Sequence, residues 1–267
     1  MNLLKRVLLG LVITVACFCY FFSYSYTEPA PAAGRYELEE FFPLLNLTKF
    51  KYLLDPHNLC AEETNLLIAV HTARNNFDAR EAIRETYGGL KSYKSWNLKV
   101  VFFMGIAGTS EPTFVEPLLR EESANYSDIV VGDFMDTYKN LSYKHIMIYK
   151  WADQHCYHPN IEFVLKVDDD IFVNIFNVMD DIIPQLKSDK KSYRGLSMYG
   201  NGPQRGPKDK WYVSEDDYEL DLYPDYCSGS AYVMKAEVIH KIVIASEKIP
   251  FRLWVSLHGL TILFQQL

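Results

Sequence analysis

The stretch "FVLKVDDDIFV", Phe163–Val173, sets three consecutive aspartates between two apolar runs. The first run is nearly continuous in apolar residues, which is typical of a strand buried on both faces of a parallel sheet. Carboxylates directly after such a strand are costly unless something compensates their charge. Ligands of α/β sheets bind at the carboxyl ends of strands, so we expect a functional site at Asp168, Asp169 and Asp170.

Around this stretch the chain alternates short apolar runs with longer mixed segments. Strands are predicted at residues 65–73, 98–105, 128–134 and 161–167, and helices at 76–90, 111–125, 140–156, 172–187 (ending at Pro184) and 235–245. This order predicts an α/β fold whose mostly parallel, Rossmann-like sheet is flanked by helices.

The three aspartates have two interpretations. In an extended chain Asp168 and Asp170 point to one side and Asp169 to the other. A divalent cation such as Mn²⁺ or Mg²⁺ would turn the repulsion between Asp168 and Asp170 into attraction, with substrate phosphates and water as further ligands. The alternative is an acidic cap on a helix that begins near Ile171. The pattern lacks the spaced ligands and the glycine of an EF-hand.

Composition limits the classes of partner. The formal net charge is −7 and 49% of the residues are hydrophobic. Nucleic-acid binding requires a basic surface, so we expect no nucleic-acid partner. The hydrophobic content is sufficient for a substantial core.

The first residues have the pattern of a membrane anchor. Residues 1–6 include Lys5 and Arg6 and are predicted to be a cytosolic tail, followed by an uncharged transmembrane signal-anchor at 7–26. A cleaved signal peptide is the alternative, but bulky aromatic residues stand where a cleavage site needs small ones. Residues 27–60 begin with "TEPAPAAG" and are predicted to form a stem.

The sequence after the anchor suits a secretory lumen. Acceptor sequons for N-glycosylation begin at Asn46, Asn125 and Asn140. Three further cysteines, Cys60, Cys156 and Cys227, allow one disulfide and one unpaired thiol, and the sequence does not decide which pair forms.

Several motifs resemble those of one enzyme family. "KVDDDIFV" is similar to the DxD-type metal motif of the β-1,3-galactosyltransferase and β-1,3-N-acetylglucosaminyltransferase family. Further segments resemble that family in the same order, and together they cover about residues 65–250: "REAIRETYGG" (80–89), "FFMG" (102–105), "SDIVVGDFMDTYKNLSYK" (127–144), "KWYVSEDDY" (210–218) and "YPDYCSGSAYVM" (223–234). Tyr87 stands where the family has tryptophan.

The resemblance implies a GT-A-like enzyme of the Golgi membrane, single-pass and type II, with its catalytic domain in the lumen. It would transfer a sugar with inversion from a UDP-sugar donor to the glycan of a glycoprotein or glycolipid, using Mn²⁺, with Mg²⁺ as the alternative. Galactose is the favoured sugar and N-acetylglucosamine the alternative; pairing with a related transferase is a further expectation. The glycosyltransferase domain is expected at residues 61–251, followed by an atypical tail at 252–267.

The resemblance also implies residue roles. Asp168 and Asp170 would hold the metal, and Arg80, Arg84 and Asp169 would contact the donor. For the two arginines the alternative is a solvated helix face paired with Glu81 and Glu85.

On the sugar side the resemblance points to Trp211, Tyr212 and Gly229. A core aromatic pair and a plain turn are the alternatives for these positions. Lys144 is expected to be a surface helix lysine or a site residue, and Asp133 and Asp136 are expected to be structural.

The chain departs from the family where a catalytic base is expected. An inverting transfer needs a base for the acceptor hydroxyl, and the family's acidic motif should follow a segment like the one ending at Phe251. Residues 248–267 contain no Asp or Glu. Either this chain is a catalytically impaired isoform that binds UDP and metal in the lumen, or a base comes from Glu215, Asp216 or Asp217.

Overall fold

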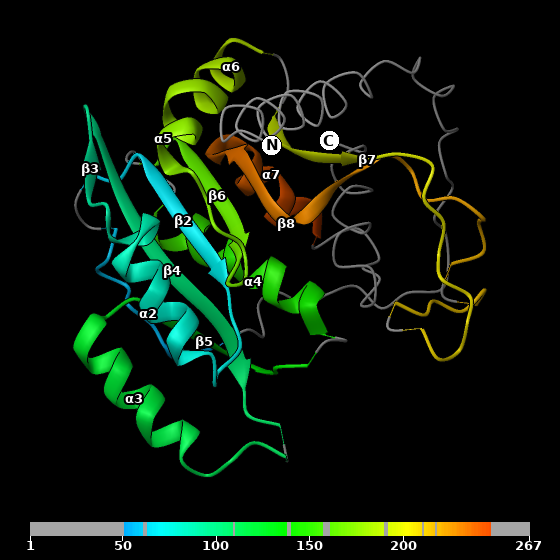
Figure 1. The fold of residues 1–267 in the computed structure, drawn as a ribbon, viewed down its shortest axis with the longest axis horizontal. Helices are drawn as coiled ribbons and strands as arrows, with labels where there is room; N and C mark the ends of the chain where they lie inside the picture. Colours follow the sequence, from blue (N-terminus) through cyan, green and yellow to red (C-terminus); the bar gives the residue numbers. More distant parts are fainter. Residues whose placement is uncertain are drawn as a thin grey trace, which may run out of the picture. The chain divides into compact units, whose positions relative to one another are not determined.

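The computed structural model describes residues 51–60, 63–108, 110–137, 140–156, 161–189, 192–209, 211–216 and 218–246. Within them, an eight-stranded sheet carries helices on both faces (Figure 1). The predicted tail, anchor, most of the stem and the atypical C-terminal tail lie outside the described residues. No helix among the described residues is both long and apolar enough to cross a bilayer.

The sheet is mixed rather than mostly parallel. Its order is β1-β5-β4-β2-β6-β8-β7, with β3 paired to β4. The central strands β5, β4, β2 and β6 run parallel, as predicted, while β1, β3, β8 and β7 pair antiparallel. The bounds are β1 Tyr52–Leu54, β2 Leu66–His71, β3 Ser92–Tyr93, β4 Trp96–Ile106, β5 Ile129–Met135, β6 Phe163–Asp168, β7 Tyr193–Met198 and β8 Tyr226–Lys235.

The predicted helices are present, with one change. Their bounds are α2 Phe77–Glu85, η2 Tyr87–Gly89, α3 Val115–Tyr126, α4 Leu141–His155, α5 Ile175–Asn177, the π-helical η4 Val178–Ile182, α6 Ile183–Ser188 and α7 Ala236–Ser246. The helical segment does not end at Pro184, as predicted, but continues to Ser188. Pro184 is the second residue of α6 and follows the π-helical η4 without a break in the helical segment.

The two faces of the sheet have separate cores. Side chains alternate along β2, so Leu67 and Ala69 pack with α4 and α7, whereas Ile68 and Val70 pack with α2, α3 and the α5–α6 segment. His71 continues this alternation on the α4 side, where its ring contacts His145.

A disulfide resolves the open cysteine pairing. It joins Cys60 to Cys156, whose Cα atoms lie 5.2 Å apart, and leaves Cys227 as a free thiol. Trp151 on α4 also donates a hydrogen bond to Asp55. Both contacts tie the segment before β2 to the end of α4.

The strand registers bring distant segments to one edge of the sheet. His71 at the end of β2 pairs in register with Asp168 at the end of β6. Because β8 runs antiparallel to β6, its first residues lie at this same edge, and so does the connection 199–225 between β7 and β8 (Figure 1). The sequence did not predict β7 or β8, because β8 begins with small polar residues rather than an apolar run.

Candidate active site

Asp168, the first of the three aspartates, is partly buried and already paired. Its side chain is 38% exposed, and its Oδ1 accepts a hydrogen bond from Nζ of the buried Lys166. His71 Nδ1 lies 3.7 Å from the same oxygen. Burial raises the pKa of Asp168 above its ordinary value, while Lys166 acts in the opposite direction. Asp168 is therefore a carboxylate whose charge the protein itself partly compensates.

Asp169 turns away from its neighbours and holds a loop. Its Oδ2 accepts hydrogen bonds from Thr72 Oγ1 at 2.6 Å and Asn76 Nδ2 at 2.8 Å. Its backbone N–H donates to the His71 carbonyl at 3.0 Å. The turn after β6 is thus joined to the loop after β2. The prediction that Asp169 contacts the donor stays a prediction, but this carboxylate already has two protein donors.

Asp170 is the exposed member of the three. Among the described residues, none forms a hydrogen bond or an ion pair with its carboxylate. A carboxylate with these properties is available to a cation or a ligand. The prediction that Asp170 and Asp168 hold a metal stays a prediction.

Two histidines and a lysine lie behind Asp168. The rings of His71 and His145 are 4.1 Å apart, and both side chains are buried. Burial lowers the pKa of both histidines well below the ordinary value, and Lys166 adds to the effect. Both imidazoles are therefore neutral, and Lys166 is the cation that faces Asp168.

The two arginines of the "REAIRETYGG" motif are held by protein groups. Arg80 is fully buried and donates to Glu122, and Arg84 donates to Glu122 and Asp128. The guanidinium of Arg84 also stacks over the ring of Tyr126 at 3.9 Å. Their predicted donor contacts are untested. The alternative pairing with Glu81 and Glu85 is wrong, because the partners come from α3 and the start of β5 instead.

Lys144 is buried rather than on the surface. Its Nζ donates to the Thr72 carbonyl at 2.9 Å and to Asp136 at 2.7 Å, and Asp136 accepts the Gly105 N–H at 3.0 Å. These contacts join the loops after β2 and β5 to the last residues of β4. Asp133 accepts a hydrogen bond from the backbone N–H of Lys51, just before β1. The structural role expected for Asp133 and Asp136 stays a prediction.

The predicted sugar-side residues lie on two different elements. Trp211 and Tyr212 belong to the connection 199–225 and are 52% and 37% exposed, so they are not a core aromatic pair. Arg205 donates to three carbonyl groups within this connection, which fixes its fold. Gly229 lies inside β8 rather than in a turn, and its carbonyl accepts a hydrogen bond from Lys166.

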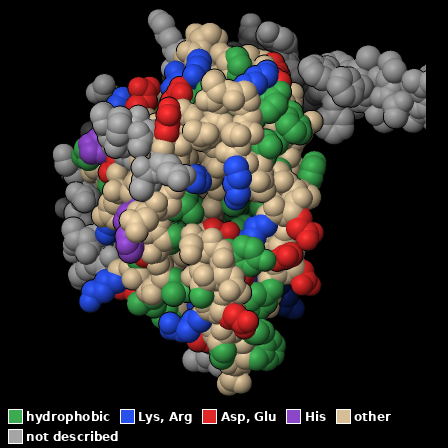
Figure 2. All heavy atoms as spheres, turned by 90° about the vertical axis from the view of Figure 1, so that its left-hand side faces the viewer, with side chains coloured by type: hydrophobic (Ala, Val, Ile, Leu, Met, Phe, Trp, Pro, Cys, Tyr) green, Lys and Arg blue, Asp and Glu red, His purple; other side chains and the backbone are tan. Residues whose placement is uncertain are grey.

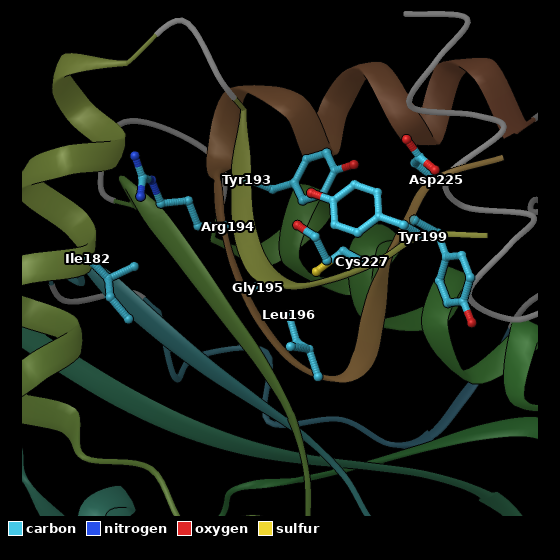
Figure 3. A pocket seen from close by; sticks show the side chains of 10 residues that line it. Ile182, Tyr193, Arg194, Gly195, Leu196, Tyr199, Asp225 and Cys227 are labelled. Carbon is cyan, nitrogen blue, oxygen red and sulfur yellow. The ribbon is translucent and has the colours of Figure 1, made fainter. Parts of the chain in front are cut away.

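A cavity of about 530 Å³ lies along β7 and the start of β8 (Figure 3). Tyr193, Tyr199, Asp225 and Cys227 are among its lining residues. Burial raises the pKa of the Cys227 thiol to about 11. In the sheet, β8 lies between β7 and β6, the strand that ends at the aspartates.

A second cavity, of about 650 Å³, lies between η2 and the segment after Asp170, with Tyr87 and Phe172 in its wall. Figure 2 shows acidic, basic and hydrophobic side chains interspersed on the side of the molecule that is at the left in Figure 1. The expected absence of a nucleic-acid partner stays a prediction.

Comparison with known families agrees with the motif order. The family model described as "Galactosyltransferase" matches residues 78–255, about two thirds of the chain. The chain belongs to this galactosyltransferase family. The predicted family is thereby confirmed, and the match includes α2 from its second residue on, the three aspartates and β8.

Two curated relatives illustrate the family. The chain is 34% identical over 200 residues to "Beta-1,3-galactosyltransferase 1" of Mus musculus, covering 74% of this chain and 60% of that protein. It is 32% identical over 194 residues to "UDP-GalNAc:beta-1,3-N-acetylgalactosaminyltransferase 1" of Rattus norvegicus, covering 72% and 58%. The chain thus spans about 60% of the length of the relatives it matches.

Among solved structures, a Pyrobaculum calidifontis mannosyltransferase in complex with GDP-Man and Mn²⁺ aligns with a TM-score of 0.38 and 14% identity, over 70% of this chain and 48% of that one. A likeness of this size carries no inference about the site.

The carboxylates at the site suit a cation that takes its other ligands from a phosphorylated molecule. The described residues contain no group of three or more His, Cys, Asp or Glu side chains that could hold a metal. Mg²⁺-type sites commonly use one or two carboxylates and take their other ligands from substrate phosphates and water. Asp170, with Asp168 beside it, meets that requirement.

Sequence reasoning missed three residues that shape the site. Thr72 and Asn76 hold Asp169, and Lys166 holds Asp168. The signal for Lys166 was visible, because a lysine inside a strand of buried residues requires an anionic or carbonyl partner nearby. Nothing in the sequence marked Thr72 or Asn76, whose partner lies more than 90 positions away.

Proposed function

We propose that this chain acts as a hexosyltransferase that forms β-1,3 linkages from a UDP-sugar, with galactose as the favoured sugar. The observation that carries the proposal is the exposed Asp170 beside Asp168 at the carboxyl edge of the sheet, in a chain of the galactosyltransferase family. The fold is taken to be of the GT-A type, as the motif resemblance implies.

The residues around the three aspartates would have different roles in binding the UDP-sugar. Asp170 and Asp168 would hold Mn²⁺, or alternatively Mg²⁺, and the bound cation would stabilise the charge of the UDP leaving group. Lys166 orients the Asp168 carboxylate and opposes the effect of burial on its pKa, and Asp169 fixes the turn through Thr72. The donor diphosphate would therefore lie outside the ends of β2 and β6.

The acceptor glycan would approach from the connection 199–225, which leaves the sheet at the same edge. Exposed aromatic rings such as Trp211 and Tyr212 suit stacking against the apolar face of a sugar. Within the same connection Glu215 and Asp216 are exposed, and each is a candidate base for the acceptor hydroxyl. Asp217 and residues 247–267 lie outside the described residues.

Two other donors deserve a direct comparison with UDP-galactose. UDP-N-acetylglucosamine follows from the shared family motifs. UDP-N-acetylgalactosamine follows from the rat relative, whose name specifies that donor. A catalytically impaired lumenal isoform that binds UDP and metal is the remaining alternative.

The proposal includes a place in the cell. Residues 7–26 would anchor the chain in the Golgi membrane as a type II protein, and Asn46, Asn125 and Asn140 would be glycosylated in the lumen. A related transferase could pair with it there. Microscopy of the tagged full chain together with a glycosidase-induced shift in mass tests these assignments; a non-glycosylated cytosolic protein would contradict them.

The central experiment separates binding from transfer. The full chain is incubated with Mn²⁺ and each of the three UDP-sugars, and UDP release is measured with and without β-linked glycan acceptors. Asp170→Asn should weaken UDP-dependent Mn²⁺ binding and abolish any turnover, while the exposed Asp180→Asn should change neither. Binding without turnover supports the impaired isoform, and the absence of both UDP and Mn²⁺ binding would refute the proposal.

A further inference from the structure

Arg80 is completely buried, and all three guanidinium nitrogens have partners inside the protein. Nε and Nη2 donate to the Glu122 carboxylate at 2.9 and 2.7 Å. Nη1 donates to the Ala73 carbonyl at 2.7 Å, and Nη2 also donates to the Arg74 carbonyl at 3.1 Å. In this arrangement no N–H group of Arg80 is directed to a ligand.

The backbone that Arg80 holds is the one that holds Asp169. Thr72 precedes the two carbonyl groups bound by Arg80, and its hydroxyl lies 3.4 Å from Arg80 Nη1 and donates to Asp169 Oδ2 at 2.6 Å. A continuous series of contacts therefore runs from Glu122 on α3, through Arg80 on α2, to the turn that presents Asp170.

We propose that Arg80 is a positioning residue for the metal-binding turn. Together with Glu122 it fixes the loop at residues 72–74. The hydrogen bond from Thr72 to Asp169 then holds the turn in which Asp170 lies. The proposal rests on the proposed function, because it assumes that Asp170 receives the cation. In this proposal Arg80 does not contact the UDP-sugar itself but acts on the site through the loop at residues 72–74.

Arginine suits this position better than lysine. Its planar fork can bind a carboxylate in two-point fashion while its other N–H groups reach carbonyl oxygens. Burial alone would raise the pKa of Glu122, but hydrogen bonds from Arg80 and Arg84 bring it below the ordinary value, so Glu122 stays ionised.

Asp128 provides a matched control at the other end of the same network. It is buried and accepts two hydrogen bonds from Arg84, at 2.8 Å each. No hydrogen bond joins it to the loop at residues 72–74 among the described residues. Asp128→Asn therefore weakens a buried ion pair of the same network without touching the loop.

The experiment compares Arg80→Lys, Thr72→Val, their double variant and Asp128→Asn in the full chain. Amide hydrogen exchange of the metal-free protein reports on the segments 72–76 and 168–171. Electron paramagnetic resonance of Mn²⁺ with UDP gives metal affinity. Where turnover is present, the KM of the UDP-sugar and kcat are measured at saturating Mn²⁺.

Arg80→Lys should speed exchange in both segments and weaken Mn²⁺ binding roughly 10- to 100-fold, as expected for a residue that orients metal ligands. Where turnover is present, the donor KM should rise with kcat changed little. Thr72→Val should reproduce these effects, and the double variant should add little to Arg80→Lys. Asp128→Asn should lower Tm but leave Mn²⁺ affinity and the exchange of 168–171 unchanged.

Several results would overturn the proposal. Unchanged exchange at 168–171 in Arg80→Lys, or an equal loss of Mn²⁺ affinity in Asp128→Asn, would show that Arg80 contributes only general stability. Unchanged affinity in Thr72→Val beside a large loss in Arg80→Lys would indicate direct donor contact instead. If Arg80→Lys does not fold, Glu122→Gln takes its place, since it weakens the hydrogen bonds that hold Arg80 and keeps the arginine; unchanged exchange at 168–171 in Glu122→Gln would then overturn the proposal. If the wild-type chain binds neither Mn²⁺ nor UDP, the proposed function fails, while hydrogen exchange still decides whether Arg80 orders the turn.

Discussion

Lys166→Met is the substitution whose cost follows most directly from the contacts of the site. Lys166 has a side chain that is 1% exposed, and its Nζ donates to the Asp168 carboxylate and to the Gly229 carbonyl in the neighbouring strand. Burial lowers the pKa of Lys166 and Asp168 opposes that shift. Methionine has a similar length and leaves no large cavity, so the change removes the charge and its hydrogen bonds.

The magnitude depends on how much water can replace the lost contacts. Removing one partner of a buried ion pair typically costs about 3–5 kcal/mol. Asp168 is 38% exposed, so water recovers part of that loss at the carboxylate. The Gly229 carbonyl is buried and loses a hydrogen bond from a charged donor, worth about 1.5–3 kcal/mol. The change also removes the cost of burying the lysine charge, several kcal/mol, which offsets part of these losses. We therefore expect Lys166→Met to lower the free energy of unfolding by about 2–3 kcal/mol.

Urea unfolding monitored by circular dichroism measures this change. The double variant Lys166→Met/Asp168→Asn should lose less than the sum of the two single variants, because the unpaired carboxylate is then absent. Lys187→Met is the control: this lysine is 45% exposed in its pair with Glu162, and we expect a change within about 1 kcal/mol. A loss below about 1 kcal/mol for Lys166→Met, or strict additivity in the double variant, would refute the assigned role.

Four further predictions concern other parts of the chain. Cys227, with a pKa of about 11, should react with iodoacetamide at pH 7.5 at least roughly tenfold more slowly than an ordinary thiol, measured by peptide mass spectrometry. Replacing Cys60 and Cys156 together by serine should lower the free energy of unfolding by about 2–5 kcal/mol in urea titrations, and an unchanged midpoint would contradict this. The pKa of Glu122 is lower in the folded state than in the unfolded chain, so its contribution to the free energy of unfolding is complete above about pH 4.3 and declines as the pH falls. When the pH is lowered from 6 to about 3, the free energy of unfolding should therefore fall less for Glu122→Gln than for the wild type. Asn125 is exposed at the end of α3, so Asn125→Gln should remove one glycan in a secretory host, seen as a smaller mass.

The apolar runs predicted the centre of the fold well. The strands that became β2, β4, β5 and β6 are long and continuously hydrophobic, so their pattern was clear from the sequence alone. The edge strands were not predictable in the same way. β1 and β3 are only 3 and 2 residues long, and β8 begins with "YCSGS", which reads as a turn.

The charged residues of the site could not be assigned from local sequence. Arg80 and Lys144 are buried, yet each stands in a helical segment where a solvent-exposed charge is the usual expectation. Their partners are remote: Glu122 is 42 positions from Arg80, and the Thr72 carbonyl is 72 positions from Lys144. Local sequence specifies which residue types occur, whereas the packing of α2, α3 and α4 on the sheet determines which charges meet.

The three adjacent aspartates now have three different environments, and this difference explains why they can stand side by side. Asp168 faces the buried cation Lys166, and Asp169 accepts hydrogen bonds from Thr72 and Asn76. Only Asp170 is exposed and without such a partner among the described residues. Two of the three charges are therefore compensated before any ligand binds, and the protein leaves one carboxylate for a cation. A cation at this position would need only weak additional support from Asp168, so an Asp168→Asn variant should retain more Mn²⁺ affinity than Asp170→Asn.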